Sequence, residues 1–322
     1  MRPDSLLAIP SLLSAAVARR RAVAEARGLE AYRLVNGPAD AAPEGLTLDR
    51  YGEWRVLGVR AGTSSELIEG WAAAAAVGAE GVVVKTWARV PADSSSRVWS
   101  GPSAPVVRVR EGDVQFICEL DQGPPTGLFL DHRETRFGIR PYAVGVEVLN
   151  LFAYTGSFSV HAAKAGAQRV TSVDVAKRAL QRGRENMVAS GLDPDQHRWF
   201  PDDVLKHLQR PQAPRYGLVI ADPPLYGHAG GARFSLLRDL DRLWSGVLAR
   251  LLPGGVVVFS THATSLDHSA LEAAAARAAF ELGRPIEVLH RWGLPEWDHP
   301  AYQAPNAADR GDYLSTLVLR AG

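Results

Sequence analysis

Apolar positions in the second half of the chain follow two alternating periods. From residue 144 onward, apolar runs of strand length alternate with stretches whose apolar residues recur at helical spacing. This alternation predicts a parallel, doubly wound α/β sheet, closed by an antiparallel pair of strands at 286–291 and 313–319. The predicted strand–helix pairs are Val146–Leu151 with Ser157–Ala165, Arg169–Val173 with Lys177–Ala189, Leu218–Ala221 with Leu236–Leu251, and Val256–Ser260 with Ser269–Phe280.

The first part of the chain has a different pattern of apolar and polar residues. An apolar stretch from Leu6, followed by three arginines at 19–21, predicts an amphipathic helix through Arg27, because a secretory signal carries its positive charge before the apolar run. A Ser- and Pro-rich stretch, Arg89–Pro105, predicts a loop. Short strands are predicted at 32–35, 46–49, 55–59 and 81–85, a helix at 65–79 and a hairpin at 106–120.

These patterns predict three parts. We expect an N-terminal helix over residues 1–28, a small α/β domain for substrate recognition over 29–121, and a Rossmann-like domain over 122–322. The length of 322 residues suits two domains with large cores.

Composition and charge narrow the class of protein. A net charge of +1 argues against binding long nucleic acid by bulk electrostatics, but not against a site for one nucleotide. One cysteine, Cys118, excludes an intramolecular disulfide and suits a reducing compartment. Because no apolar run reaches the length of a membrane span, we expect a cytoplasmic protein without a membrane partner.

The turn after the first strand of the C-terminal domain indicates the cofactor. Ligands of open α/β sheets bind beyond the carboxyl ends of the strands, where the strand order reverses. With a single glycine, Gly156, this turn cannot form the glycine-rich nest that a dinucleotide pyrophosphate requires. It suits S-adenosylmethionine (SAM), which needs a tight turn and no phosphate nest. The predicted cofactor-binding residues here are Asn150, Phe152, Tyr154, Thr155, Gly156 and Ser157.

Acidic residues follow the next two strands. Asp174 lies 18 residues after Gly156 and is predicted to bind the ribose hydroxyls, with capping of the following helix as the alternative. Asp202 and Asp203 stand where an acid would accept the adenine amino group, and one of them is expected to cap a helix from Val204 to Leu208.

The most specific motif follows the strand at 218–221. It reads Asp222-Pro223-Pro224-Leu225-Tyr226. The two prolines fix the backbone so that Asp222 and the carbonyl of Pro223 face the cofactor and substrate, while Tyr226 can stack on a planar ring. We therefore predict a catalytic role for Asp222, Pro223 and Tyr226, with Asp222 also contacting the cofactor.

Together these motifs resemble the RlmI/RlmK-type class I methyltransferases, which modify large-subunit ribosomal RNA, over residues 28–322. The resemblance implies a SAM cofactor held by the turn and by the acids named above, RNA as the substrate, and a homodimer. Arg133 fits a role at the methionine carboxylate, which a guanidinium can clamp with two hydrogen bonds. The matching segments, in the family's order, are 32–37, 45–52, 126–133, 150–156, 172–174, 202–204, 222–224 and 298–300.

Two departures from the family bear on the reaction. Relatives of the RlmI type start with a PUA RNA-binding module, whereas this chain begins at the helix that would follow it. Methylation at cytosine C5 needs a thiolate that attacks C6. In related C5 enzymes this cysteine follows the next strand, where this chain reads Ser260-Thr261-His262.

We therefore expect methylation of a nitrogen in an RNA base. Direct displacement needs a lone pair held in line with the methyl group, which Asp222 and Pro223 could aim. His262 could accept a proton, or could be an ordinary polar loop residue.

Two other functions stay open: a methyltransferase of small molecules or proteins, and a SAM- or RNA-binding protein that has lost catalysis. No metal site is predicted, because His228, His290 and His299 are scattered without partners at ligand spacing.

Overall fold

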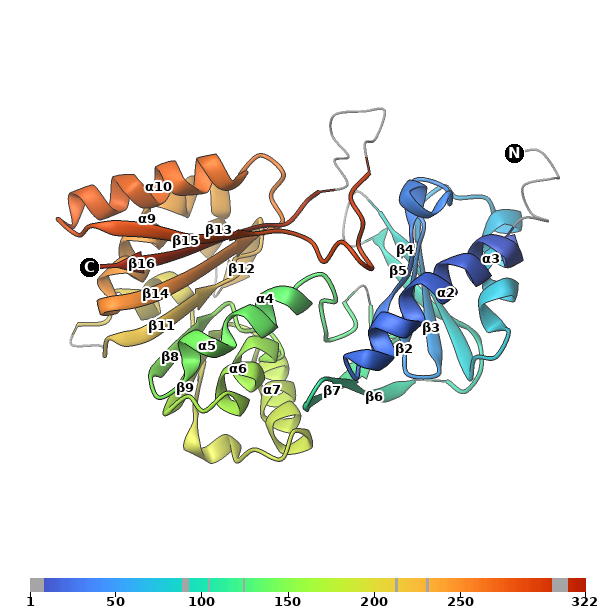
Figure 1. Ribbon diagram of the computed structural model, residues 1–322, viewed down its shortest axis with the longest axis horizontal. Helices are drawn as coiled ribbons and strands as arrows, with labels where there is room; N and C mark the ends of the chain where they lie inside the picture. The colour runs from blue at the N-terminus through green and yellow to red at the C-terminus, as the bar shows by residue number, and fades with distance from the viewer. Residues whose placement is uncertain are drawn as a thin grey trace. The chain divides into compact units, whose positions relative to one another are not determined.

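The chain forms two compact units. The computed structural model describes residues 9–88, 93–103, 105–123, 125–211, 214–229, 232–302 and 312–322 (Figure 1). Unit 1 comprises Met1–Asp131 with Pro295–Gln303, and unit 2 comprises His132–Leu294 with Ala304–Gly322. A segment late in the sequence therefore belongs to the N-terminal unit.

Unit 1 is built on a five-stranded sheet in the order β1-β2-β3-β4-β5. Helix α2 (Ile9–Ala26) packs against β1, and α3 (Ser65–Ala76) packs against β3 and β4, which are parallel because α3 crosses between them. A separate hairpin of β6 and β7 follows, as predicted. The strands are β1 (Ala31–Asn36), β2 (Thr47–Tyr51), β3 (Trp54–Arg60), β4 (Gly81–Trp87), β5 (Ser95–Ser100), β6 (Val106–Glu111) and β7 (Val114–Glu119); a short 3-10 helix, η1, spans Gly37–Asp40.

The loop predicted over Arg89–Pro105 is wrong in part. Residues 95–100 form strand β5, which pairs with β4 in antiparallel register, Val98 opposite Val83. An edge strand buries little side-chain surface, so β5 can be built from serine and arginine without an apolar run. Residues 89–92 and 104 of the predicted loop lie outside the described residues.

The segment at 295–302 completes unit 1 beside β1. The carboxylate of Asp298 accepts a hydrogen bond from the backbone N–H of Arg33 at 3.2 Å, and the side-chain amide of Asn36 donates to the carbonyl of Pro300 at 3.0 Å. Asp298 and His299 are buried, and Nδ1 of His299 lies 2.9 Å from Oδ1 of Asp298. Two motifs of the family resemblance, at 32–37 and 298–300, thus meet within this unit.

Unit 2 contains a seven-stranded sheet in the order β10-β9-β8-β11-β14-β16-β15. Strands β8 to β11 and β14 are parallel, and β16 and β15 run antiparallel, as predicted. A two-stranded hairpin, β12–β13, was not predicted. The strands are β8 (Glu147–Leu151), β9 (Arg169–Asp174), β10 (Arg198–Pro201), β11 (Tyr216–Ala221), β12 (Tyr226–Ala229), β13 (Ala232–Ser235), β14 (Leu251–Thr261), β15 (Ile286–Trp292) and β16 (Ser315–Ala321).

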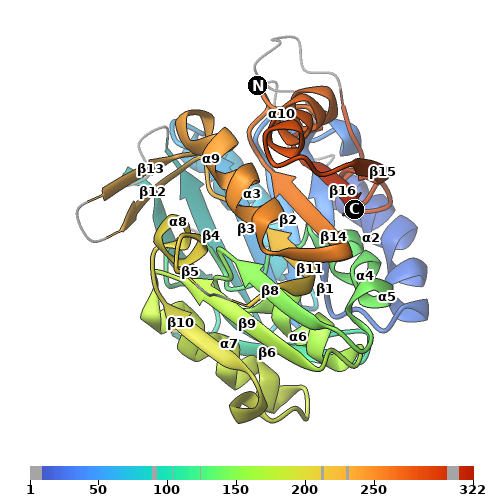
Figure 2. The same ribbon diagram turned by 90° about the vertical axis from the view of Figure 1, so that its left-hand side faces the viewer.

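Helices cover both faces of this sheet (Figure 2). The register places Leu149, Val219, Val257 and Leu319 in one row across four strands, all fully buried in the core formed with α8, α9 and α10. Burial on both faces explains the continuous apolar runs of the strands. The helices are α4 (Arg133–Gly138), α5 (Arg140–Ala143), α6 (Ser157–Lys164), α7 (Lys177–Ala189), α8 (Val204–Leu208), α9 (Leu236–Ala249) and α10 (His268–Glu281), with a 3-10 helix, η3, at Pro194–Gln196.

The predicted doubly wound α/β fold is confirmed, including the closing antiparallel pair. Among the described residues, no helix is both long and apolar enough to cross a membrane.

Lys85 on β4 makes the stability of unit 1 dependent on pH. Its side chain is 1 % exposed, its Nζ donates to the carbonyl of Gly123 at 2.6 Å, and burial lowers its pKa from 10.5 to about 8. Between these values the unfolded chain binds more protons than the folded one, so stability contributed by this site rises with pH.

We expect Lys85→Met to stabilise the protein at pH 7.5, and this advantage over wild type to shrink by about 3 kcal/mol as the pH approaches 10.5. Urea denaturation at several pH values measures the difference. Lys206→Met, at an exposed position, is the control and should show no such trend. A constant advantage for Lys85→Met across this range would contradict the prediction.

Candidate functional site

The predicted site residues of unit 2 lie at one edge of its sheet. Strand β8 has β9 on one side and β11 on the other, so the strand order reverses at β8. The turn 152–156 follows β8, Asp174 ends β9, Asp202 and Asp203 follow β10, and Asp222 follows β11. Carboxyl ends of parallel strands meet at the same edge, which is where open α/β sheets bind ligands.

The turn after β8 is strained and held by Asp174. Phe152 and Tyr154 adopt positive φ angles of 56° and 48°, which non-glycine residues rarely do, and Gly156 follows at 70°. One carboxylate oxygen of Asp174 accepts from the N–H of Tyr154 and the other from the N–H of Ala176, both at 2.8 Å. Asp174 therefore shapes the turn, and each oxygen keeps a second lone pair for a ligand hydroxyl.

Helix α7 approaches this turn closely. Asn186, fully buried, donates to the carbonyl of Thr155 at 3.0 Å. A Cβ added to Gly183 would lie 2.6 Å from the Trp199 ring and 3.2 Å from the Thr155 carbonyl oxygen. Glycine at position 183 is required because no side chain fits between the helix and the turn.

Asn150 lies beneath the turn. Its amide donates to Ser159 Oγ at 2.8 Å, and Ser159 Oγ lies 2.8 Å from Ser172 Oγ, so α6 is tied to β8 and β9 through buried polar groups. The amide oxygen of Asn150 is buried without a hydrogen-bond partner among the described residues. Ser157, half-buried, begins α6.

The two adjacent acids after β10 have different partners. Asp203 caps α8 by accepting from the N–H of Lys206 at 2.9 Å. Asp202 pairs with Arg210 at 2.8 Å and lies 3.5 Å from Nδ1 of His207. Burial, followed by the charge of Arg210, lowers the pKa of His207, so Arg210 is the cationic partner of Asp202 near neutral pH.

Asp222 faces a histidine that the sequence did not reveal. Oδ2 of Asp222 lies 3.1 Å from Nε2 of His132; the Asp222 side chain is 20 % exposed and that of His132 is 1 % exposed. Pro223 is buried beside them. The two residues are 90 positions apart, so only the fold brings them together.

The hairpin β12–β13 carries Tyr226 at the same edge. Phe234 on β13 packs on Phe152 of the turn with ring centroids 5.2 Å apart, and the N–H of Leu236 donates to the carbonyl of Leu225 at 3.0 Å. Tyr226 itself is 67 % exposed. The hairpin therefore fixes the backbone at Tyr226 while leaving its ring in solvent.

Two further predicted residues lie next to His132, one in sequence and one in space. Arg133 begins α4 with a fully buried side chain. His262 follows β14 and is exposed, and its ring stands perpendicular to that of His132 with centroids 5.0 Å apart.

Comparison with known proteins identifies the class. The family described as S-adenosylmethionine-dependent methyltransferase matches residues 55–299, and the chain belongs to this family. It is therefore a SAM-dependent methyltransferase of the class I fold, as the sequence predicted.

Individual relatives agree with the resemblance to the RlmI type. The chain is 29% identical over 305 residues to ribosomal RNA large subunit methyltransferase I of Aeromonas hydrophila, covering 92% of this chain and 76% of the relative. The same enzyme of Serratia proteamaculans is 30% identical over 293 residues, 86% of this chain and 72% of the relative. The crystal structure of SMU.776 complexed with SAH matches with a TM-score of 0.84 and 27% identity, over 98% of this chain and 81% of that one.

The close approach of α7 to the turn can be tested with Gly183→Ala. Helix propensity alone favours alanine by about 1 kcal/mol. The overlap with Trp199 should outweigh this gain and cost about 1–3 kcal/mol. We expect a less stable protein that binds SAH more weakly, measured by urea denaturation and isothermal titration calorimetry.

A double-mutant cycle with Trp199→Leu is the control, since it removes the ring that alanine would meet. The cost of alanine at position 183 should be smaller in the leucine background. An equal cost in both backgrounds would contradict this explanation.

Proposed function

We propose that this methyltransferase modifies a base in ribosomal RNA at a nitrogen atom. The observation that carries the proposal is the placement of Asp222, partly exposed at the carboxyl end of β11, with its carboxylate against buried His132. A carboxylate there can accept a hydrogen bond from an amino or ring N–H group of the base. This bond would orient the lone pair of that nitrogen toward the methyl group. Unit 2 contains no thiol for C5 chemistry, because the one cysteine of the chain, Cys118, is buried on β7 of unit 1.

The residues at the sheet edge fit SAM. We assign the ribose hydroxyls to Asp174, whose oxygens each keep a lone pair, and the adenine amino group to Asp202 or Asp203 beside it. The turn 152–156 would lie along the methionine part, with Arg133 at its carboxylate; Asn150 and Ser157 would support the turn. When bound, SAM supplies a methyl group already activated by its sulfonium sulfur, so the protein needs chiefly to bind and orient.

RNA as the substrate is supported by the relatives, which are named as ribosomal RNA methyltransferases. A base inside RNA reaches such a site only when it is unpaired or flipped out of its helix. Tyr226, exposed on a fixed backbone, offers a ring on which that base could stack. A ribosomal RNA substrate would also place the enzyme in the cytoplasm.

Asp174→Asn tests the cofactor assignment. Asparagine keeps the shape of the side chain but replaces one acceptor oxygen with a donor, which opposes the N–H of either Tyr154 or Ala176. We expect the affinity for SAH, measured by calorimetry, to fall about 100-fold, since a backbone N–H that shapes the turn and a ribose hydroxyl each lose their acceptor. Asp195→Asn, at an exposed position on η3, is the control, and equal losses in both variants would count against the assignment.

Transfer of labelled methyl from SAM tests the substrate. We expect label to enter total RNA from cells that lack the protein, and Asp222→Ala to lower the rate at least about 100-fold, because the group that aims the nitrogen is lost. The matched control, Asp241→Ala on the exposed side of α9, should keep wild-type activity.

Nuclease digestion and chromatography of the nucleosides then identify the modified atom. A labelled N-methyl nucleoside is the expected product, and 5-methylcytidine would overturn the argument from the missing thiol. If label enters protein or small molecules while RNA stays unlabelled, the substrate is a protein or a small molecule and not RNA. SAH binding without transfer to any fraction would identify a binding protein that has lost catalysis.

A further inference from the structure

His132 is a buried imidazole for which the proposed function has given no chemical role. It precedes α4 without capping it, and its ring packs edge-on against Phe158 with centroids 5.4 Å apart. Nε2 lies 3.1 Å from the Asp222 carboxylate, yet neither ring nitrogen makes a hydrogen bond with any of the described residues. A buried polar group without such a bond is costly, and where it persists it is often functional.

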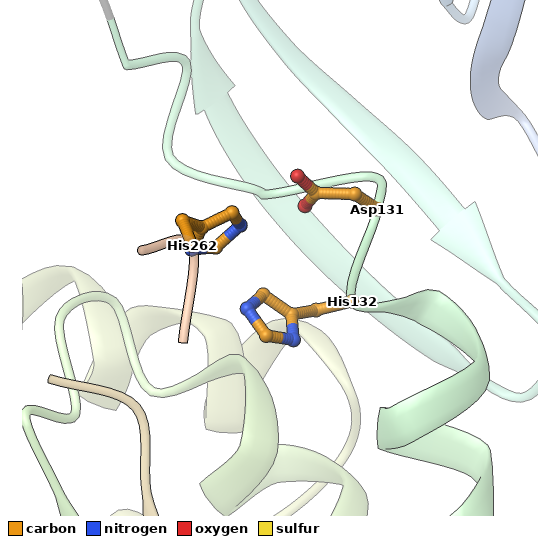
Figure 3. Close-up of side chains that lie close together, drawn as sticks. All are labelled: Asp131, His132 and His262. Carbon is orange, nitrogen blue, oxygen red and sulfur yellow. The ribbon is translucent and has the colours of Figure 1, made fainter. Parts of the chain in front are cut away.

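His262 is exposed to solvent and its ring lies beside that of buried His132. A ring nitrogen of His262 lies within 4.8 Å of a ring nitrogen of His132, which is a separation that one water molecule can bridge. Figure 3 shows the His132 side chain pointing toward the His262 ring. The His262 ring also stacks on that of Tyr313 at a centroid distance of 5.8 Å, which restricts the exposed ring.

We propose that Asp222, His132 and His262 form a path that removes a proton from the methylated atom. This inference rests on the proposed function and deepens it, because it restricts the target to a nitrogen or oxygen that carries hydrogen. A tertiary ring nitrogen loses no proton on methylation and would not need the path.

Methyl transfer forms a bond between the heteroatom and the methyl carbon and breaks the carbon–sulfur bond of the donor, whose electron pair goes to sulfur. The heteroatom becomes cationic and gives up its proton to Asp222, which contacts it, and the proton comes to rest on Nε2 of His132, 3.1 Å away. His262 then takes one proton from the imidazolium through water and releases it to solvent, which restores the path.

Imidazole suits this role better than a carboxylate alone. A carboxylate ordinarily titrates near pH 4 and holds a proton poorly at neutral pH, whereas imidazole titrates near pH 6.5. The imidazolium formed on His132 would be stabilised by Asp222, as in other histidine–carboxylate pairs. Among the described residues, charged or titratable groups also stand at Asp131 and Arg133, the chain neighbours of His132, and at Tyr313, whose ring lies against His262.

Single-turnover methyl transfer tests the path. The probe is large-subunit ribosomal RNA transcribed in vitro, with labelled SAM, over pH 5.5 to 9. In the wild type the rate constant should rise with pH and then level off. His132→Gln should lose about 100-fold at the plateau and its pH dependence, because glutamine cannot take up a proton. His262→Ala should lose less and recover with imidazole added to the buffer.

Matched controls separate this role from a structural one. His290 is an exposed histidine of β15 whose ring forms a hydrogen bond with the Tyr142 hydroxyl of α5. His290→Gln should keep the wild-type pH profile. The dissociation constant for SAH should stay within about twofold of wild type in every histidine variant, since none is assigned to the cofactor. Loss of rate in His132→Gln with an unchanged pH profile would overturn the proposal.

A second measurement needs no RNA. In histidine labelled with ¹⁵N, NMR should show coupled titrations of His132 and His262. Independent titrations would overturn the path, as would a stoichiometric metal ion bound to the two imidazoles in the purified protein. If wild type labels no RNA while the titrations are coupled, the RNA substrate fails and the proton path stands.

Discussion

The conformation of the candidate site at the edge of the unit 2 sheet depends on the hydrogen bonds that Asp174 accepts from Tyr154 and Ala176. One oxygen of its carboxylate accepts from Tyr154 in the turn after β8, and the other accepts from Ala176 just before α7. These hydrogen bonds, together with the one from Asn186 to the Thr155 carbonyl, offset the strain of positive φ at Phe152 and Tyr154, which costs about 1 kcal/mol or more at each residue. The position of the turn in turn determines where α6 begins and where Phe152 meets the hairpin β12–β13.

The elements of unit 2 could be predicted because their burial is regular. Strands covered on both faces become continuous apolar runs, and α7 was predicted with the bounds that the structure shows. Strand β5 and the hairpin β12–β13 could not be predicted in the same way. Both are short and sit at edges, where neighbouring strands supply the hydrogen bonds and the sequence needs no apolar pattern.

The candidate site could also be predicted only in part. Acids and prolines at the ends of predicted strands were visible because topology alone places them at one edge. The sequence could not decide which of Asp202 and Asp203 caps α8, since either residue type suits an N-cap and only the backbone angles distinguish them. His132 was missed because its significance comes from Asp222, which approaches it only in the folded chain.

The segment at 295–302 has a consequence for the order in which the protein is made. Asp298 and Pro300 hydrogen-bond to Arg33 and Asn36, but the ribosome synthesises them more than 250 residues later. Domains generally fold as they emerge, beginning at the N-terminus. Here the segment that hydrogen-bonds to β1 leaves the ribosome only after most of unit 2, and neither unit corresponds to an uninterrupted stretch of the gene.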